Sequence, residues 1–242
     1  MKTLRFPQGR LEIRDDAPVQ ETAFVVAGGR KPATGWLKLM KERFTGGTEV
    51  FAVDRGLDYC LVAGIEPTLT LGDGDSCLPE YWQKEKAAGN VVAFDRAKDR
   101  TDLQLMLERL PEDRFWLFTG VFGGRLDHLY SVMRALEHAA LEGKRTVVLA
   151  DERELAVLVP AGTSVEFYPP EDETPVAISL LPVTDSSKVS LEGVRWPLDG
   201  AVLTKENPYA ISNEMSEAEQ EAEMPHVCFR CHEGMTIFYI AG

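Results

Sequence analysis

Residues 114–150 read RFWLFTGVFGGRLDHLYSVMRALEHAALEGKRTVVLA, which is an apolar run, a glycine-containing loop, a long amphipathic segment and a second apolar run. The short runs at 114–119 and 145–150 are typical of buried strands. The segment between them, residues 126–142, predicts a helix, because its apolar side chains recur at helical spacing. That stripe comprises Leu129, Met133, Leu136 and Ala140. The unit is therefore the strand, helix and strand of a parallel sheet.

The same alternation runs upstream from residue 22. Further strands are predicted at 22–27, 49–53, 68–71 and 90–94. Helices are predicted at 35–44 and from Thr101 to Leu110, the second opening with a capping box formed by Thr101 and Gln104. We therefore expect residues 1–144 to form an α/β domain with a doubly wound, mostly parallel sheet, in which residues 1–20 are an added arm or hairpin.

After residue 150 the helical pattern stops, and short strand-like runs alternate with Pro, Gly and Asp. We expect residues 145–242 to form an all-β sandwich. The acidic stretch 214–223 has no apolar stripe and predicts a solvated loop or a short exposed helix. Cys228, Cys231 and His232 copy a haem-attachment spacing, but they lie within the alternation of a C-terminal hairpin. The predicted strands are 157–159, 165–167, 176–181, 189–198 and 227–240.

Composition excludes several classes of function. The 242 residues contain 26 Lys and Arg against 39 Asp and Glu, a net charge of −13, which argues against nonspecific binding to nucleic acid or anionic lipid. The sequence contains no apolar stretch typical of a signal peptide or a membrane span, so we expect a cytoplasmic protein. Four cysteines are too few for a disulfide framework in a chain of this length.

Ligands of open α/β sheets bind at the carboxyl ends of the strands, so the residues after each predicted strand are compared. Between them, four loops bring together carboxylates, glycines and a few cations. They read Asp54-Arg55-Gly56, Gly72-Asp73-Gly74-Asp75-Ser76, Lys98-Asp99-Arg100-Thr101-Asp102 and Gly120-Val121-Phe122-Gly123-Gly124-Arg125-Leu126-Asp127-His128.

Clustered carboxylates repel one another unless a cation lies among them, and Mg²⁺ typically takes one or two carboxylates plus substrate phosphates. The glycines would let the backbone approach phosphates, whose charge Lys98 and Arg125 would neutralise. Each motif alone is typical of a surface turn or a helix cap. The ordered set favours a magnesium-nucleotide site, although neither a Walker P-loop pattern nor a protein-kinase signature occurs.

The ordered set resembles the thiamine pyrophosphokinase family, whose chains carry an Asp near the second strand, then G-D-x-D-S, K-D-x-T-D, G-G-R-x-D-H, a C-terminal Trp and S-N-E. This chain adds Trp196 and Ser212-Asn213-Glu214 to the four loops, so the resemblance spans residues 54–214. It implies an α/β domain followed by a β-sandwich, ATP as donor, AMP as by-product, and thiamine held between the subunits of a homodimer. Two departures bear on nucleotide geometry and acceptor choice: Arg55 and Leu57 replace small residues, and Gly74 replaces an apolar one.

The resemblance also implies residue roles in an in-line attack of the thiamine hydroxyl on the β-phosphorus of Mg-ATP. Asp73, Asp75 and Asp99 are expected to hold Mg²⁺ and orient the hydroxyl, one of them accepting its proton. Arg125 and Lys98 are expected to stabilise the transferring diphosphate. The residues expected to complete the ATP and thiamine sites are Asp54, Ser76, Thr101, Asp102, Asp127, Trp196, Ser212 and Asn213.

Alternatives stay open at this point. Arg125 and Asp127 would instead form an interdomain salt bridge. Trp196 would lie in the sandwich core or a dimer contact, since its parity matches Val194 and Leu198, or at an edge where it stacks on thiamine, since Pro197 excludes a central strand. The rival functions are a diphosphokinase for another heterocyclic alcohol such as a hydroxymethylpterin, a magnesium-dependent phosphohydrolase, and a catalytically silent sensor.

Overall fold

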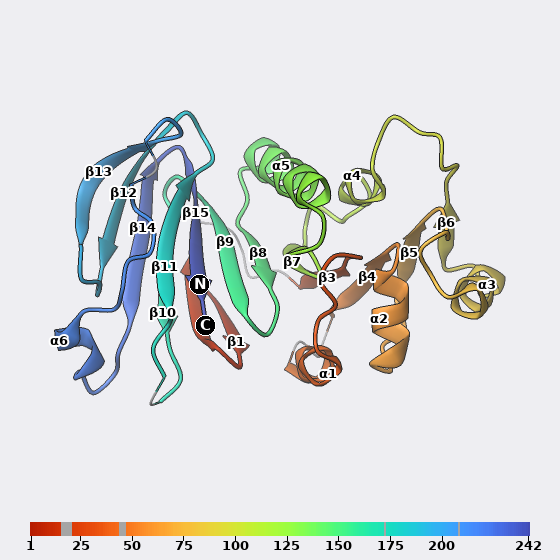
Figure 1. Ribbon diagram of the computed structural model, residues 1–242, viewed down its shortest axis with the longest axis horizontal. Helices are drawn as coiled ribbons and strands as arrows, with labels where there is room; N and C mark the ends of the chain where they lie inside the picture. Colours follow the sequence, from red (N-terminus) through yellow and green to blue (C-terminus); the bar gives the residue numbers. More distant parts are fainter. Residues whose placement is uncertain (16–20, 44–46, 172, 208) are drawn as a thin grey trace. The chain divides into compact units, whose positions relative to one another are not determined.

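The computed structural model describes residues 1–15, 21–43, 47–171, 173–207 and 209–242. They fall into two units, whose elements are labelled in Figure 1. We call Gln20–Ala139 together with Leu149–Asp151 the α/β unit. The β unit comprises Met1–Val19, Ala140–Val148 and Glu152–Gly242. Among the described helices, none combines the length and the apolar character that a membrane crossing requires.

Five parallel strands form the sheet of the α/β unit, in the order β7-β3-β4-β5-β6. Every residue of β3 and of β7 is buried, as the apolar runs predict for strands covered on both faces. The predicted strands match the observed ones within one residue at each end, and the parallel sheet is confirmed. The strands are β3 (Thr22–Val26), β4 (Glu49–Val53), β5 (Leu69–Gly72), β6 (Val91–Ala93) and β7 (Phe115–Thr119).

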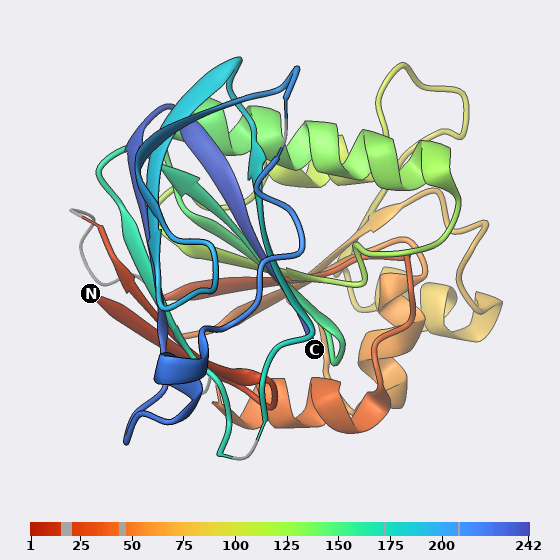
Figure 2. The ribbon, with the colours of Figure 1, turned by 60° about the vertical axis from the view of Figure 1, so that its left-hand side comes forward.

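Helices cover both faces of this sheet, which confirms the doubly wound arrangement. Figure 1 and Figure 2 place α1, α2 and α3 on one face and α4 and α5 on the other. The predicted helices α1, α4 and α5 are observed, although α4 is shorter than expected and Phe44 lies outside the described residues. We did not predict α2, which is only seven residues long, or α3, whose sequence is mostly polar. The helices are α1 (Thr34–Arg43), α2 (Gly56–Val62), α3 (Pro79–Ala87), α4 (Asp102–Leu107) and α5 (Leu126–Gly143).

The strand order contains a topological switch point beside β3. The chain moves outward from β3 through β4, β5 and β6, and then returns to the other side of β3 as β7. The helices that follow β3 and β7, α1 and α5, lie on opposite faces of the sheet (Figure 1), and ligands of such sheets bind at the carboxyl ends of the strands at this point.

The β unit is a sandwich of antiparallel strands, as predicted. One sheet has the order β1-β2-β10-β14-β12-β13, and a second group has the order β11-β15-β9. Phe229 of β14 stacks on Phe238 of β15 with ring centroids 5.3 Å apart, so side chains of the two layers meet in the core. A last strand, β8 (Val147–Ala150), has residues in both units. The strands of the β unit are β1 (Lys2–Phe6), β2 (Gly9–Arg14), β9 (Glu154–Pro160), β10 (Ser164–Tyr168), β11 (Ala177–Pro182), β12 (Ser186–Glu192), β13 (Leu198–Thr204), β14 (Val227–Glu233) and β15 (Met235–Ala241).

The N-terminal hairpin differs from the expectation in its partner. Strands β1 and β2 form the predicted hairpin, but β2 pairs with β10, so the hairpin belongs to the β unit rather than to an α/β domain of residues 1–144. Leu11 and Ile13 are fully buried, so the apolar face of the hairpin stabilises the sandwich.

The single strand predicted at 189–198 is wrong. Strand β12 ends at Glu192 and β13 begins at Leu198, with a bend between them. Gly193 adopts a φ of +79°, a conformation that ends the strand. Trp196 lies in this bend with 54% of its surface exposed, so it is not a residue of the sandwich core. The acidic stretch contains the short exposed helix α6 (Glu217–Gln220), in agreement with its pattern.

Candidate active site

A cavity of about 690 Å³ lies at the carboxyl ends of the strands of the α/β unit. Its size is within the range of small-molecule sites. The loops after β3, β4, β5, β6 and β7 all contribute to its lining, together with the first turns of α5. Of the predicted site residues, it brings together Asp54, Asp73, Asp75, Ser76, Lys98, Thr101, Asp102, Arg125 and Asp127.

Charges of both signs are concentrated in this cavity, although the whole chain is strongly acidic. Because five bases are gathered among five acids, the cavity offers cations to an anion that the rest of the chain would repel. The acids are Asp54, Asp73, Asp75, Asp102 and Asp127, and the bases are Arg55, Arg96, Lys98, Arg100 and Arg125.

Asp54 is the most perturbed acid of the cavity. It follows β4 with a φ of +51°, a conformation uncommon outside glycine, and its backbone N–H donates to the Leu71 carbonyl at 3.0 Å. Burial, reinforced by the nearby Asp102 and Asp73, raises the pKa of Asp54 to about 7. Its Oδ1 atom is buried without a hydrogen-bond partner. The fold therefore places a carboxylate where its negative charge is unfavourable unless a cation approaches.

Asp73 has the opposite character. Desolvation acts to raise its pKa, but the hydrogen bond from the Asp75 backbone and the charges of Lys98 and Arg96 hold the pKa of Asp73 below its ordinary value. The Asp75 N–H donates to Asp73 Oδ1 at 3.0 Å. Asp73 is therefore ionised at neutral pH and available as a ligand.

The loop after β6 places Lys98 and Asp102 in contact. Lys98 Nζ lies 3.2 Å from Asp102 Oδ2, and burial raises the pKa of Asp102 while Lys98 opposes that shift. Thr101 forms the predicted capping box with Gln104, which fixes the first turn of α4 and with it Asp102. Asp99 is exposed and does not line the cavity, so in this structure Asp102 is the acid that this loop contributes.

Arg125 and Asp127 form a pair within one loop. Arg125 donates to both carboxylate oxygens of Asp127, at 3.1 and 2.6 Å, and both side chains are exposed. The alternative of an interdomain salt bridge is therefore wrong, because each residue's partner is two positions away. Exposed ion pairs contribute little stability, so the pair serves to orient the Arg125 guanidinium beside the cavity.

The residues that depart from the family pattern are accommodated by the fold. Leu57 is fully buried in the core, whereas Arg55 lines the cavity and donates from Nε to the Ser76 carbonyl at 3.3 Å. Gly74 has a φ of +79°, and a Cβ atom there would lie 2.6 Å from the Trp82 ring. Trp82 of α3 thus fills the space that a side chain at position 74 would need.

One loop of the cavity was missed by sequence reasoning. Gly28 and Gly29, directly after β3, line the cavity beside Gly120 and Gly123. The signal was present, because the same comparison of residues after each strand would have included Gly28-Gly29-Arg30. The loop has no carboxylate, and for that reason the search for acidic loops passed over it.

The remaining predicted residues lie in the β unit. Asn213 is buried and holds the Trp196 backbone from both sides: it accepts from Trp196 N at 3.1 Å and donates to Trp196 O at 2.8 Å. Ser212 has a φ of +57°, and its N–H donates to Ser179 Oγ at 3.0 Å. The side chain of Asn213 therefore positions Trp196, whose ring remains exposed.

The cavity residues suit a metal that is bound together with phosphates. Among the described residues, no group of three or more His, Cys, Asp or Glu side chains is arranged to hold a metal ion unaided. Mg²⁺ needs only one or two carboxylates when phosphates complete its coordination. The buried and unpartnered oxygens of Asp54, Asp102 and Ser76 fit that requirement. Cys228 and Cys231 are three residues apart in β14, so their side chains point to opposite faces of the sheet and cannot share a metal.

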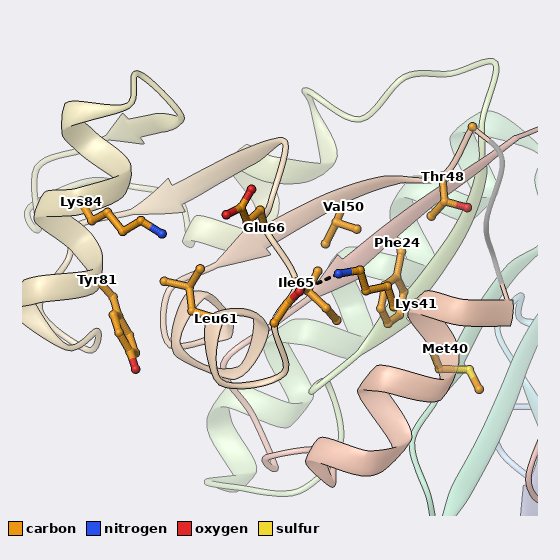
Figure 3. Close-up of a pocket in the computed structure, with 12 residues that line it drawn as sticks. Phe24, Met40, Lys41, Thr48, Val50, Leu61, Ile65, Glu66, Tyr81 and Lys84 are labelled. Atoms are coloured by element: carbon orange, nitrogen blue, oxygen red, sulfur yellow. Dashed lines mark hydrogen bonds between the residues drawn. The ribbon is translucent and has the colours of Figure 1, made fainter.

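A second cavity of about 600 Å³ lies at the amino ends of β4 and β5 (Figure 3). Its lining is mainly apolar, and Lys41 Nζ is already engaged by the Gly64 carbonyl at 2.6 Å. The first cavity, which combines glycine loops with charges of both signs, is therefore the better candidate for binding phosphates.

Comparisons with known proteins agree with this geometry. The catalytic-domain model of the thiamin pyrophosphokinases matches residues 44–149, and the vitamin B1 binding domain model of the same family matches residues 164–235. A thiamine pyrophosphokinase of Bacillus subtilis is 31% identical over 204 residues, which cover 81% of this chain and 90% of that protein.

Solved structures show the same similarity. The crystal structure of thiamine pyrophosphokinase from Bacillus subtilis has a TM-score of 0.71 at 27% identity, covering 91% of this chain and 98% of the other. Thiamin pyrophosphokinase from Candida albicans shares the fold alone, with a TM-score of 0.71 at 13% identity, covering 92% of this chain and 90% of the other.

The pKa of Asp54 yields a prediction about stability without ligands. Because this pKa is raised to about 7 in the folded state, the folded protein binds the proton more tightly, and stability falls as pH rises from about 4 to about 7. Asp54→Asn removes the charge, and we expect it to raise the melting temperature by roughly 3–6 °C at pH 8 and by much less at pH 4.5. Thermal melts in EDTA measure this. Asn, like Asp, tolerates a positive φ, so the substitution should leave the backbone strain unchanged. An equal gain in melting temperature at both pH values would refute the electrostatic explanation.

Proposed function

The chain belongs to the thiamin pyrophosphokinase family, and from that premise we propose that its acidic cavity binds ATP with Mg²⁺ and transfers the diphosphate to the hydroxyl of thiamine, leaving AMP. One observation carries the proposal. A glycine-lined cavity holds buried carboxylate oxygens without partners beside five basic side chains. A metal ion would coordinate the carboxylate oxygens, and the phosphates of a nucleotide would pair with the basic side chains.

In this proposal the carboxylates of the cavity bind and attract the metal ion. Bound Mg²⁺ would neutralise charge on the phosphates as the diphosphate is transferred. Asp73 and Asp75 are held together by a hydrogen bond, and Asp73 is ionised, so they are the best placed to hold the metal. The assignment of Asp99 to the same task stays a prediction. The unpartnered oxygens of Asp54 and Asp102 would face the same cation, and the charge of these residues would strengthen the attraction for it.

The basic residues would orient the diphosphate. Lys98 is held by Asp102 and by the Asp95 carbonyl, and Arg125 is held by both oxygens of Asp127. Fixed cations stabilise a transition state without first having to reorganise, which is the main contribution a protein makes to phosphoryl transfer. The backbone of the glycine loops would approach the phosphates closely.

Thiamine would bind through the β unit. The match of residues 164–235 to a vitamin B1 binding domain supports this division, as does the exposed ring of Trp196. An indole face is a favourable partner for a flat cationic ring. Asn213 would keep that ring in place through the Trp196 backbone.

We also propose a homodimer in the cytoplasm. Both units expose large apolar side chains, which a second copy would cover. All four cysteines are free, as suits a reducing compartment. The exposed residues include Leu126 and Tyr130 in the α/β unit and Trp196, Tyr209 and Ile211 in the β unit.

The function is tested by product analysis. Incubation with ATP, Mg²⁺ and thiamine should give equal amounts of AMP and thiamine diphosphate, and EDTA should abolish both products. Parallel reactions replace thiamine with a hydroxymethylpterin or omit the alcohol. Faster AMP release with the pterin, or phosphate release without any alcohol, would reject thiamine as the acceptor.

Asp73→Asn tests the assignment of the metal-holding carboxylate. The change preserves shape and removes charge, and we expect kcat to fall roughly a hundredfold or more at saturating Mg²⁺ with an unchanged melting temperature. Asp113→Asn, in an exposed loop outside the cavity, is the control and should keep full kcat. Asp99→Asn should lose less than Asp73→Asn. If Asp73→Asn keeps near-normal kcat, the loop of residues 72–76 is only a surface turn and Asp73 does not hold the metal.

Trp196→Ala tests the thiamine site. Because the ring is more than half exposed, its removal should change the melting temperature little, while the loss of stacking should raise the thiamine KM roughly thirtyfold and leave the ATP KM unaltered. Steady-state kinetics and a thermal melt measure both effects. Val202→Ala, a similarly exposed apolar residue of the β unit, is the control. An unchanged thiamine KM would remove Trp196 from the site.

A further inference from the structure

A largely buried ion pair lies next to the glycine loops of the cavity without lining it. Arg30 Nε and Nη2 both donate to Asp151 Oδ2, at 2.9 and 2.6 Å. Asp151 has no exposed surface, and Arg30 is about three-quarters covered. Both residues belong to the α/β unit, where Arg30 follows β3 and Asp151 follows β8. The pair therefore joins the ends of two strands that are far apart in sequence.

Arg30 is also part of a seam between the two loops of the switch point. The backbone N–H groups of Ala27, Gly29 and Arg30 donate to the loop after β7. Their acceptors are the carbonyls of Thr119, Gly120 and Phe122, at 2.9, 2.7 and 2.8 Å. These hydrogen bonds tie the loop after β3 to the end of β7 and to the loop after it, and Arg30 is one of the residues that make them.

The seam is tightly packed. A Cβ atom at Gly29 would lie 2.5 Å from the Gly120 carbonyl, and one at Gly123 would lie 3.1 Å from Arg30 Cβ. Tyr59 of α2 donates from its hydroxyl to the Gly29 carbonyl at 3.2 Å. Because Gly28, Gly29, Gly120 and Gly123 line the cavity, the seam forms its glycine wall.

Stability alone does not explain the ion pair. A buried charge pair often gains no more free energy than apolar side chains of the same size, because both ions lose their hydration. The guanidinium instead fixes the orientation of the Arg30 side chain, since two of its N–H groups donate to one carboxylate oxygen of Asp151. An apolar replacement would fill the space without fixing the angle at which Arg30 enters the seam.

We infer that Arg30 and Asp151 are a positioning pair that holds the glycine wall at the distance from which its backbone meets the phosphates of ATP. The inference rests on the proposed function, because it names ATP as the ligand of the wall. Neither residue lines the cavity. The pair sets the affinity for ATP and leaves the affinity for thiamine unaffected.

The decisive variant replaces both charges. Arg30→Met or Asp151→Leu alone removes one charge of a largely buried ion pair and should lower the melting temperature strongly. The double variant removes both charges, so its melting temperature should lie above that of either single variant. If the pair positions the wall, the double variant still binds Mg-ATP about tenfold or more weakly by calorimetry, with an unchanged thiamine KM. If ATP affinity recovers together with the melting temperature, the role is structural only and the inference is wrong.

Two further variants sharpen the test. Arg30→Lys keeps the positive charge but loses the planar guanidinium with its two N–H donors. It should weaken Mg-ATP binding several-fold and lower the melting temperature only modestly. Arg114→Met, which breaks the ion pairs of Arg114 with Glu49 and Glu21 at the amino ends of the same sheet, should lower the melting temperature without changing ATP affinity. A comparable loss of affinity in Arg114→Met would overturn the inference, because any destabilisation would then suffice. Wild-type protein that fails to bind Mg-ATP would overturn the proposed function itself.

Discussion

The α/β unit depends on the burial of β3 between β4 and β7. This strand is covered along its whole length, and its parallel register with both neighbours fixes where their loops emerge. Because the chain leaves β3 in one direction and returns on its other side, a cavity at their carboxyl ends follows from the topology. The loops decide only what lines it. Carboxylates, glycines and cations meet there because each follows a strand whose place is set from β3 outward.

Features with a local cause could be predicted from the sequence. The strands of the α/β unit are short apolar runs, and Thr101 caps α4 through a residue three positions away, so both are visible in a short window. The pairing of β2 with β10 is different in kind, because it joins Ile13 to Val165. No window of sequence contains both, and a hairpin with one apolar face would suit either unit. The bend at Gly193 was missed because Trp196 keeps the parity of a strand after the strand has ended.

The same distinction holds for the candidate site. The acidic loops were found because each follows a strand directly, and their carboxylates are close together for that reason. Which acid of the loop after β6 faces the cavity depends on the first turn of α4, and that turn brings in Asp102 rather than Asp99. Arg30 and Asp151 are 121 residues apart, and an arginine after one strand gives no sign of which carboxylate it meets. Asn213 likewise reads as a polar loop residue until its two hydrogen bonds to Trp196 are seen.

The contact of Gly74 with Trp82 has a consequence for the exchange of segments between relatives. A side chain at position 74 and an indole at position 82 compete for one space, so each excludes the other. A larger residue at position 74 would therefore require a smaller side chain at position 82. The two positions are coupled through packing. A loop taken from a relative with a larger residue at position 74 would therefore clash with Trp82 unless α3 were exchanged with it.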